Sequence, residues 1–502
     1  MNRKLLSLFI AVIMAVCTFA AYAAAEGNPE WMPAEWDMNA DVVVVGFGPA
    51  GAMAARSAIE NNASVIIVEK ESKEFAGGSA ATSAAFKGVF EAKHLYESAL
   101  GRMTMEEAQR MYDLEEDCIQ WLNDRGMEWQ GSAVVGNGRG FYDAVVKAME
   151  TLDVQVLYES PAVKLIADPA NREVHGIQCK QADGKDLFIR ANKGVVLATG
   201  GYAANKDLMS RFHFADMIDY AVAGAPNQTG DGLIMALDIG AALDGVTNQQ
   251  IEWYTFSFKA ASDEMGTGIV HTPPALGPYS HIFVNAKGER FMDEEMRVTH
   301  SKCQMPFLAY DGTHPVFNGY FNLPMYVIFD QAMFEGGPVG SHDGGCTYAS
   351  LYGIHNWSED NQDELDRGWI VKADTIEELV EKLAAQSGND PIDAENLKKT
   401  IETYNAGCAE QKDAFGRSEF MLDPIGEGPY YAAQLEPTIV YTIGGLCGGS
   451  NGETLDWYGN PIPRLYHAGD IGQPTKMRIS ALWGCMALGS IAGDACSQLT
   501  SH

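Results

Sequence analysis

Positive charge is scarce in this chain of 502 residues. Lysine and arginine number 35 against 67 aspartates and glutamates, which gives a formal net charge of −32 at pH 7. A surface this acidic argues against a nucleic acid as the partner and would speed the encounter with a basic protein. Solubility alone is the second interpretation of the same charge.

Long apolar runs are missing after residue 25, since no later stretch approaches the roughly 18 uninterrupted apolar residues of a membrane-spanning helix. Residues 1–25 differ, because Arg3 and Lys4 precede an apolar stretch and small residues follow it. This pattern predicts a secretory signal peptide over 1–25, and the lack of a twin arginine favours the general export route. We therefore expect a periplasmic or otherwise exported protein without stable membrane insertion.

The nine cysteines form no Cys-x-x-Cys-His sequence, which is the attachment motif of c-type haem. The chain is therefore expected to attach no haem of that type. Export would permit disulfides, but the spacings select no pairing. No metal site is expected either.

A dinucleotide-binding pattern begins at Asp41. A short apolar strand over 41–45 leads into Gly46-x-Gly48-x-x-Gly51, then a helix, then a second strand over 65–68 that ends at Glu69. In this unit the first glycine allows a tight turn, the second lets the backbone approach a pyrophosphate, and the third allows close helix–strand contact. The acidic residue can accept a hydrogen bond from a ribose hydroxyl, and the helix N-terminus offers N–H groups to phosphate.

A later strand that ends in Ala198-Thr199-Gly200-Gly201 indicates which dinucleotide binds. It resembles the second fingerprint of flavoproteins of the glutathione-reductase superfamily, and the strands over 154–167 and 174–191 resemble the β-meander of such domains. No second GxGxxG with a strand and an acid is present, so no NAD(P) domain is predicted. FAD is the expected cofactor, reduced by another protein or by the substrate itself.

The glycine pair Gly77-Gly78 in the stretch 76-AGGSAATSAA-85 is interpreted as a loop along the flavin diphosphate and ribityl chain. A plain flexible loop is the alternative. No histidine lies in this stretch, so a histidyl covalent link is not supported and FAD is expected to be non-covalent.

The predicted fold class is α/β, with a Rossmann-like FAD-binding domain and an inserted α+β capping domain. We expect the first part of the FAD-binding domain over 26–249, the capping domain over 250–440 and the second part over 441–502. Helical periodicity appears over 374–386, with Thr375 as the cap, and over 393–408. The stretch 481–499 is apolar or small on nearly every face and predicts a buried helix.

The order of motifs resembles the soluble fumarate reductase family, which includes flavocytochrome c fumarate reductases, urocanate reductases and 3-oxosteroid dehydrogenases. Besides the glycine motifs these are 229-TGDG-232, 282-IFVNAKGERFMDE-294, 443-IGG-445, 466-YHAGD-470 and 490-SIAGD-494. The resemblance covers about 41–495 and implies a flavin domain with a mobile capping domain and an active site between them. The cofactor-binding residues that it and the fingerprint imply are Gly46, Gly48, Pro49, Ala50, Gly51, Glu69, Lys70, Gly77, Gly78, Ser79, Ala80, Val163, Ala198, Thr199, Gly200, Asp231, Asp470, Ala481 and Leu482.

Two of these have specific implied roles. Asp470 would meet a ribityl or ribose hydroxyl, and the helix start near Ala481 and Leu482 would stabilise charge at the flavin pyrimidine edge.

The family's chemistry is hydride delivery from reduced flavin N5 to an activated alkene, followed by protonation by a protein acid. The resemblance implies Arg297, after the segment 290-RFMDE-294, as that acid or as a clamp on the substrate oxygen. Guanidinium loses a proton with difficulty, so His300 is the chemically easier donor. An ordinary ion pair of Arg297 with Asp293, Glu294 or Glu295 is the alternative.

This chain departs from fumarate reductases at two histidine positions, where it has Tyr254 and Tyr441. A phenol offers one hydrogen bond and an aromatic face, so the pocket would suit a less charged or aromatic substrate end; both residues also fit an amphipathic rim. Arg478 is a candidate carboxylate-binding residue, or alternatively a solvent-exposed arginine at a helix start.

Three functions remain open from the sequence. The leading hypothesis is an exported FAD-dependent reductase of an α,β-unsaturated carboxylate such as fumarate, urocanate or cinnamate, fed in anaerobic respiration by a separate, basic c-type cytochrome. The second is a 3-oxosteroid-type desaturase or enone reductase. The third, of another class, is a flavin electron-transfer module without a substrate of its own.

Overall fold

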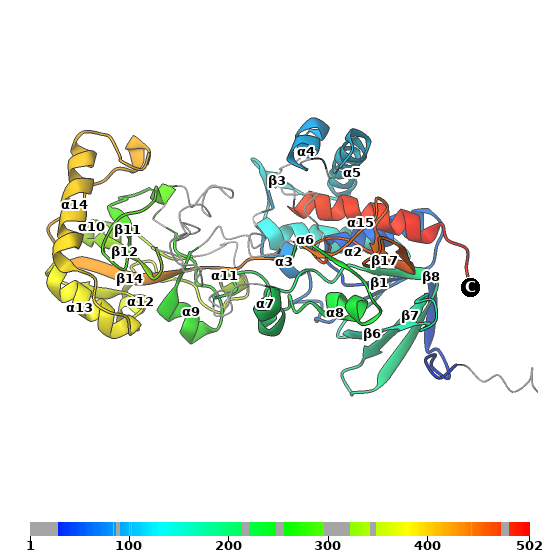
Figure 1. The fold of residues 1–502 in the computed structure, drawn as a ribbon. Coiled ribbons are helices and arrows are strands. Elements are labelled where there is room, and N and C mark those ends of the chain that lie inside the picture. Colours follow the sequence, from blue (N-terminus) through cyan, green and yellow to red (C-terminus); the bar gives the residue numbers. More distant parts are fainter. Residues whose placement is uncertain are drawn as a thin grey trace, which may run out of the picture.

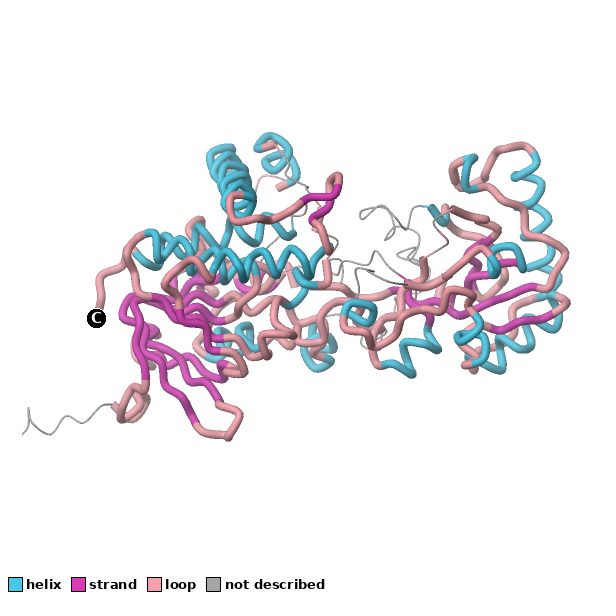
Figure 2. The backbone as a smooth tube through the Cα atoms, turned by 180° about the vertical axis from the view of Figure 1, so that it is seen from behind, coloured by secondary structure: helices cyan, strands magenta, loops and turns pink. Residues whose placement is uncertain are grey.

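The computed structural model describes residues 29–83, 85–86, 91–99, 101, 103–212, 220–246, 256–272, 274, 276–295, 322–341, 348–442, 444–472 and 481–502. Within these ranges the elements gather around two separate sheets (Figure 1), and the view from behind shows the strands at two places joined by loop segments (Figure 2). We refer to the two groups as the first lobe and the second lobe.

The first lobe contains an eight-stranded sheet with the order β16-β17-β8-β1-β2-β5, from which β7 and β6 branch at β8. The pairs β1–β2, β1–β8, β8–β17 and β2–β5 are parallel, whereas β16–β17, β6–β7 and β7–β8 are antiparallel. Its strands are β1 (Met38–Val45), β2 (Val65–Val68), β5 (Gln155–Leu157), β6 (Ala162–Ala167), β7 (Val174–Lys180), β8 (Asp186–Leu197), β16 (Glu453–Leu455) and β17 (Pro461–His467).

The apolar run at the end of β1 explains its central place. Val42 to Val45 are buried on both faces, as expected for a parallel strand covered on both sides. Val43 pairs with Ile66 of β2 and with Val195 of β8, so β1 has a parallel neighbour on each edge.

Helices lie on both faces of this sheet. Figure 1 shows α15, α2 and α6 on one face, and α8 with the β6–β7 hairpin on the other. The helices of this lobe are α2 (Pro49–Glu60), α3 (Gly78–Ala81), α4 (Ala92–Ser98), α5 (Met105–Asn123), α6 (Asn137–Met149), α7 (Lys206–Phe212), α8 (Asp231–Asp238) and α15 (Ala481–Ser497). Two short pairs accompany them: β3 (Trp129–Gln130) with β4 (Ala133–Val134), and β9 (Leu243–Asp244) with β15 (Gly445–Leu446).

Helices α2 and α15 cross at small residues. A Cβ atom on Gly489 would lie 2.1 Å from the carbonyl oxygen of Ala50, and one on Gly493 would lie 2.1 Å from that of Ala54. The backbones therefore approach more closely than side chains would allow. The predicted buried helix near the C-terminus is confirmed in α15.

The second lobe is built on an antiparallel sheet with the order β10-β14-β12-β11, in which β13 also pairs with β14. All of its strands come between β8 and β16 in the sequence, so this lobe is an insertion into the first. They are β10 (Phe256–Phe258), β11 (His281–Asn285), β12 (Met325–Asp330), β13 (Val371–Ala373) and β14 (Tyr430–Pro437). Its helices are α9 (Lys259–Met265), α10 (Gln331–Glu335), α11 (Tyr348–Leu351), α12 (Gln362–Asp366), α13 (Ile376–Ser387), α14 (Ala394–Ala409) and the 3₁₀ turn η4 (Glu419–Met421).

Capping residues begin the two long helices of the second lobe. The Thr375 hydroxyl accepts a hydrogen bond from the Glu378 N–H, and the Asp393 carboxylate accepts one from the Asn396 N–H. Both predicted helices are therefore confirmed, with the predicted cap at Thr375. Among the described residues no helix has both the length and the apolar character needed to cross a bilayer.

Candidate cofactor and active site

The first glycine-rich loop connects β1 to α2 and requires glycine at two positions. Gly46 has φ +101°, and a Cβ atom there would lie 2.4 Å from the carbonyl oxygen of Ala198. A Cβ atom on Gly51 would lie 2.0 Å from the carbonyl oxygen of Gly46. The loop is therefore held against the end of β8 and against α2 by backbone contacts that a side chain would break.

Three other glycines leave space open. Gly48 and Gly200 lie in two loops and Gly78 begins α3, and a Cβ atom on each would meet no atom within 4 Å. Gly78 and Gly200 also have positive φ, +54° and +72°. A bound dinucleotide could approach the backbone closely at these positions.

Helix α2 begins directly behind Gly48. Pro49 occupies its first turn, no side chain caps it, and its first turn contains no acidic residue. Backbone N–H groups at an uncapped helix start, such as those of Ala50 and Gly51, are suited to an anion, and the helix dipole favours negative charge there. The position fits a diphosphate.

Glu69 stabilises the glycine loop from the end of β2. One carboxylate oxygen accepts a hydrogen bond from the Phe47 N–H at 2.8 Å, and the other accepts one from the Glu71 N–H at 2.9 Å. The side chain is buried, and this burial raises its pKa, which the two N–H donors oppose. Since each carboxylate oxygen can accept a second hydrogen bond, the ribose contact expected from the sequence remains open to it.

Lys70 and Asp231, both expected to bind the cofactor, contact each other. The Lys70 ammonium lies 2.8 Å from the Asp231 carboxylate and donates to the Thr229 hydroxyl at 2.5 Å. The pair joins the end of β2 to the start of α8. Each side chain is partly exposed, so the pair borders solvent beside the loops described above.

The second glycine loop, at Gly77-Gly78, packs on an aromatic ring. A Cβ atom on Gly77, which has φ +112°, would lie 2.8 Å from the ring of Tyr142 in α6. The Tyr142 hydroxyl donates to the carbonyl of Phe47 at 2.8 Å, inside the first glycine loop. One tyrosine therefore holds both loops, and Ser79 and Ala80 continue from them in α3.

Asp470 lies in the turn after β17, beside the first turns of α2 and α15. A Cβ atom on its neighbour Gly469 would lie 3.0 Å from the Ala50 Cβ and 3.8 Å from the Cys485 Sγ. The Cys485 thiol donates to the Asp470 carboxylate at 3.5 Å. Desolvation raises the pKa of Asp470 to about 6, against the opposing effect of this thiol. Ala481 opens α15, and Leu482 beside it is half-buried.

Val163 and Thr199 border the same region. Val163 lies at a register irregularity of β6 and is 45% exposed, which is high for an apolar strand residue. The segment that leads to it is tied to Glu69, because the Ser160 N–H donates to the Glu69 carbonyl. The Thr199 hydroxyl oxygen is buried without a hydrogen-bond partner among the described residues.

Tyr441 is the candidate catalytic residue that the structure describes. It is half-buried and precedes Thr442, whose hydroxyl accepts a hydrogen bond from the Tyr202 N–H. A Cβ atom on Gly201 would lie 2.3 Å from that hydroxyl. Through its neighbour Thr442, Tyr441 therefore belongs to a segment that packs against the Ala198–Gly201 loop. The other four candidates, Arg297, His300, Tyr254 and Arg478, lie outside the described residues.

The acidic residues ahead of Arg297 have partners elsewhere. Glu294 is fully buried and accepts two hydrogen bonds from Arg290, at 2.8 Å and 2.5 Å. Glu295 accepts from the Ser418 N–H, and Asp293 accepts from the Glu295 N–H. These contacts fix the acidic segment within the second lobe, and the ion-pair alternative for Arg297 stays an untested prediction.

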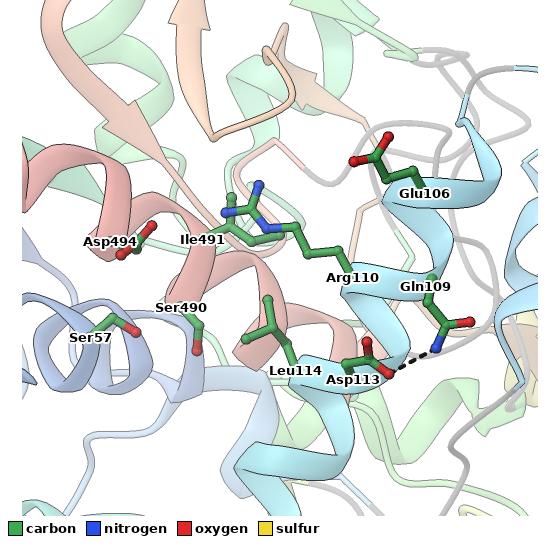
Figure 3. Close-up of a pocket in the computed structure, with 9 residues that line it drawn as sticks. All are labelled: Ser57, Glu106, Gln109, Arg110, Asp113, Leu114, Ser490, Ile491 and Asp494. Atoms are coloured by element: carbon green, nitrogen blue, oxygen red, sulfur yellow. Dashed lines mark hydrogen bonds between the residues drawn. The ribbon is translucent and has the colours of Figure 1, made fainter.

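A groove of about 560 Å³ lies away from these loops, between α2, α5 and the second half of α15 (Figure 3). Its walls combine one arginine, three carboxylates and apolar carbon, with Asp113 accepting from Gln109 at 2.8 Å. The lining residues are Ser57, Glu106, Gln109, Arg110, Asp113, Leu114, Ser490, Ile491 and Asp494. The glycine-rich loops do not line it, so we do not assign it to the cofactor.

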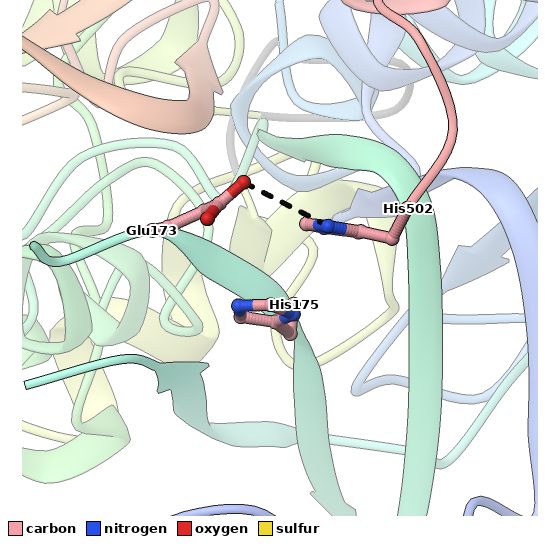
Figure 4. A group of neighbouring side chains, drawn as sticks. All are labelled: Glu173, His175 and His502. Carbon is pink, nitrogen blue, oxygen red and sulfur yellow. Dashed lines mark ion pairs between the residues drawn. The ribbon is translucent and has the colours of Figure 1, made fainter.

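Glu173, His175 and His502 lie close together in the first lobe (Figure 4). The two imidazoles are stacked, with centroids 4.3 Å apart and planes inclined by 16°, and Arg464 donates to Glu173 at 2.7 Å. Nearly parallel rings do not direct their nitrogen lone pairs at one point, and the guanidinium opposes a cation. The group is better explained as two neutral stacked histidines beside an ion pair.

The residues of the loops fit a dinucleotide: an uncapped helix start, three open glycines and a buried acceptor-rich carboxylate at Glu69. Within the described part of the chain, Thr199 adds a buried hydroxyl without a hydrogen-bond partner. The FAD binding domain family matches residues 41–473. The chain belongs to the FAD binding domain family. FAD is its cofactor, and the protein is an FAD-dependent oxidoreductase.

Three curated relatives are similar over most of the chain. A vinyl phenol reductase of Lactiplantibacillus plantarum is 27% identical and covers 86% of this chain and 89% of its own length. A urocanate reductase of Eggerthella lenta is 26% identical, with 92% and 75% covered. A fumarate reductase (cytochrome) of Shewanella frigidimarina is 27% identical, with 91% and 77% covered. These relatives confirm the family resemblance.

Two solved structures show the fold. The open conformation of a flavocytochrome c3 fumarate reductase superposes with a TM-score of 0.64 at 24% identity, covering 93% of this chain and 79% of that one. A 3-ketosteroid Δ1-dehydrogenase from Sterolibacterium denitrificans gives 0.70 at 20% identity, covering 91% and 99%. The predicted α/β FAD-binding fold with an inserted α+β domain is confirmed.

Several residues of the site were not predictable from the sequence. Tyr142 and Arg139 belong to α6, which carries none of the motifs, and reach the glycine-rich loops through tertiary contacts. Cys485 lies in α15 ahead of the 490–494 motif and contacts Asp470. Thr442 was not predicted either, although it lies between Tyr441 and the 443–445 motif. Its position in the sequence is the signal that could have identified it.

Proposed function

We propose that this protein reduces the C=C bond of an α,β-unsaturated carboxylate, of the fumarate, urocanate or cinnamate kind. Its class is the FAD-dependent oxidoreductases that act on CH–CH groups. The observation that supports the proposal best is the set of relatives matched over 86–92% of the chain, which are named as reductases of vinyl phenol, urocanate and fumarate. Each of these compounds contains a C=C bond conjugated to a ring or a carbonyl group.

The substrate end is proposed to be aromatic or weakly charged. Tyr254 and Tyr441 stand where fumarate reductases are expected to have histidines, and a phenol contributes one hydrogen bond and a ring face. Tyr441 is half-buried beside the Ala198–Gly201 loop, which supports a place for it near the cofactor. Arg478 would bind the substrate carboxylate by a bidentate contact.

FAD, once reduced, supplies the hydride for the β-carbon of the alkene. Arg297 would hold the substrate oxygen, with an attraction that grows as negative charge develops there. His300, whose proton is exchangeable near neutral pH, would deliver a proton to the α-carbon if Arg297 does not.

The second lobe, over 250–440, is proposed to be the capping domain that closes over the substrate. Its topology supports this, because its sheet is inserted between β8 and β16 of the first lobe. The remaining proposal concerns cellular context: a signal peptide over 1–25, export, and a role as a terminal reductase fed by a separate basic c-type cytochrome. The net charge of −32 supports a basic donor.

The reaction can be tested by photoreducing the purified FAD-loaded protein without oxygen and mixing it in a stopped-flow instrument with cinnamate, urocanate, fumarate, 4-vinylphenol and a 3-oxosteroid enone. We expect flavin reoxidation by at least one aromatic enoate, with dihydrocinnamate as the saturated control. Reoxidation by the steroid enone alone would support the desaturase alternative. A reduced flavin that none of these compounds reoxidises would contradict the proposal.

The role of the tyrosines has its own test. The double change Tyr254→His and Tyr441→His should raise the rate with fumarate relative to cinnamate, because two cationic donors would return to the pocket. An unchanged ratio would remove both residues from the substrate site.

A further inference from the structure

Tyr352 of the second lobe contacts the first lobe. It follows α11, and its ring lies 5.2 Å from that of Phe75 with an interplanar angle of 33°. The guanidinium of Arg139 in α6 also lies within electrostatic range of the Tyr352 hydroxyl. Figure 1 shows α11 in the space between the two lobes. Tyr352 therefore joins two side chains that belong to the FAD-binding lobe.

Arg139 in turn holds the chain that leads into the second glycine loop. Its Nη1 donates to the carbonyl of Glu74 at 2.9 Å and lies 3.5 Å from that of Ala76. Its other donors meet one Asp143 carboxylate oxygen at 2.9 Å and 2.6 Å, which fixes the guanidinium on α6. The two carbonyls come just before Gly77 and Gly78.

The same guanidinium also connects to the first glycine loop. It lies 5.3 Å from the ring centroid of Tyr142, the residue that supports Gly77 and donates to the Phe47 carbonyl. A continuous set of contacts thus runs from Tyr352 through Arg139 and Tyr142 to both FAD loops. Phe75, two residues before Gly77, provides a second, shorter connection.

The second lobe has a further tie at this place. The Tyr348 N–H, one turn before Tyr352, donates to the carbonyl of Ala223 at 3.1 Å, and the two tyrosine rings lie 4.6 Å apart. Ala223 belongs to the segment that hydrogen bonds to Ile439, close to Tyr441. The contact therefore lies beside the two segments that pair through the isolated bridge between Val222 and Ile439.

We propose that Tyr352, in the second lobe, is a positioning residue for FAD. By contacting Phe75 and Arg139 of the first lobe, it fixes the Gly77-Gly78 loop. FAD affinity then depends on the approach of the two lobes. Coupling of this kind is reciprocal, so bound FAD must favour the approach of the lobes by the same factor. The inference requires FAD as the cofactor and is independent of the proposed reaction.

The test measures FAD release from the loaded protein on dilution, by the recovery of flavin fluorescence. We expect Tyr352→Ala to weaken FAD binding about tenfold, equivalent to about 1.4 kcal/mol. Tyr352→Phe keeps the ring against Phe75 and removes the hydroxyl that interacts with Arg139, so about a threefold loss is expected. Ile354→Ala is the matched control, because Ile354 lies two residues on and is 41% exposed. It should leave the dissociation constant unchanged.

Two further readouts separate positioning from general stability. The flavin absorbance band of Tyr352→Ala should be shifted from that of the native protein, whereas the band of Tyr352→Phe should match it. FAD binding should reduce the radius of gyration of the native protein more than that of Tyr352→Ala. If Tyr352→Ala releases FAD no faster than Ile354→Ala, the proposal is wrong. Should Tyr352→Ala fail to fold, Phe75→Ala tests the same contact from the first lobe and must weaken FAD binding likewise.

Discussion

Replacing Asp470 by asparagine should make the FAD-free protein more stable and the FAD complex weaker. In the unfolded chain an aspartate ionises near pH 3.8, whereas in the folded protein burial raises the pKa of Asp470 to about 6. Between these values the folded state binds more protons. Stability therefore falls as pH rises from about 4 to about 6 and stays reduced above that.

The size of the effect follows from the pKa. A pKa about two pH units higher corresponds to a cost of at most about 3 kcal/mol for the ionised carboxylate at pH 7. Asp470 keeps some contact with solvent, so we expect asparagine to recover about 1 to 2 kcal/mol. Asparagine has no such penalty, and it can still accept from the Cys485 thiol through its carbonyl oxygen.

The assay is urea unfolding of the FAD-free protein at pH 7 and at pH 4.5, followed by tryptophan fluorescence, together with an FAD titration. The stability gain of Asp470→Asn should be present at pH 7 and small at pH 4.5, and FAD affinity should fall because a neutral amide is a weaker acceptor for a hydroxyl. Asp153→Asn, at an exposed position before β5, is the control. A variant that is less stable at pH 7, or a gain that does not depend on pH, would refute the reasoning.

Three further predictions concern the same lobe. Gly51→Ala should destabilise the FAD-free protein by at least about 2 kcal/mol in thermal unfolding, because its Cβ would lie 2.0 Å from a carbonyl oxygen. Gly48→Ala, whose Cβ meets no atom, should leave this stability unchanged and weaken FAD binding in a titration. Glu69→Gln should cost about 1–3 kcal/mol in urea unfolding, since an amide cannot accept from both the Phe47 and Glu71 N–H groups. Burial lowers the pKa of His467 to about 4, so the free energy of unfolding should drop by up to about 3 kcal/mol as pH falls from about 6.5 to 4. In a series of urea unfolding midpoints against pH, His467→Gln should flatten this dependence.

Local sequence patterns predicted the local structure well. The strand–glycine–helix unit at 41–69 follows from residues close in sequence, and so do α13 and α14 with their caps. One strand was divided: the sequence analysis separated the strand region 174–191 from the strand that ends at Ala198, yet β8 runs from Asp186 to Leu197. The strand is continuous because β1 pairs with it before and after residue 192.

Partners that are distant in sequence could not be predicted. Lys70 and Asp231 are 161 positions apart and pair because the fold brings the end of β2 to the start of α8. No periodicity or spacing encodes such a meeting. The order of the second sheet is unpredictable for the same reason, because its central strand β14 follows its other strands in sequence and yet pairs with three of them.

Two buried carboxylates and an uncapped helix start lie at or near the glycine-rich loops of the first lobe. Gly46, Gly77 and Gly200 have positive φ, the carboxylates of Glu69 and Asp470 have raised pKa values, and the start of α2 has no side-chain cap. The raised pKa values and the missing cap destabilise the FAD-free fold, and each is a group that a dinucleotide can satisfy by hydrogen bonds. A ligand that binds the folded state stabilises it by mass action, so the protein can retain these groups as long as FAD is bound. The long helices of the second lobe, capped by Thr375 and Asp393, show no such deficit. The two buried carboxylates and the uncapped start of α2 therefore support a dinucleotide site at these loops on grounds other than the sequence motif.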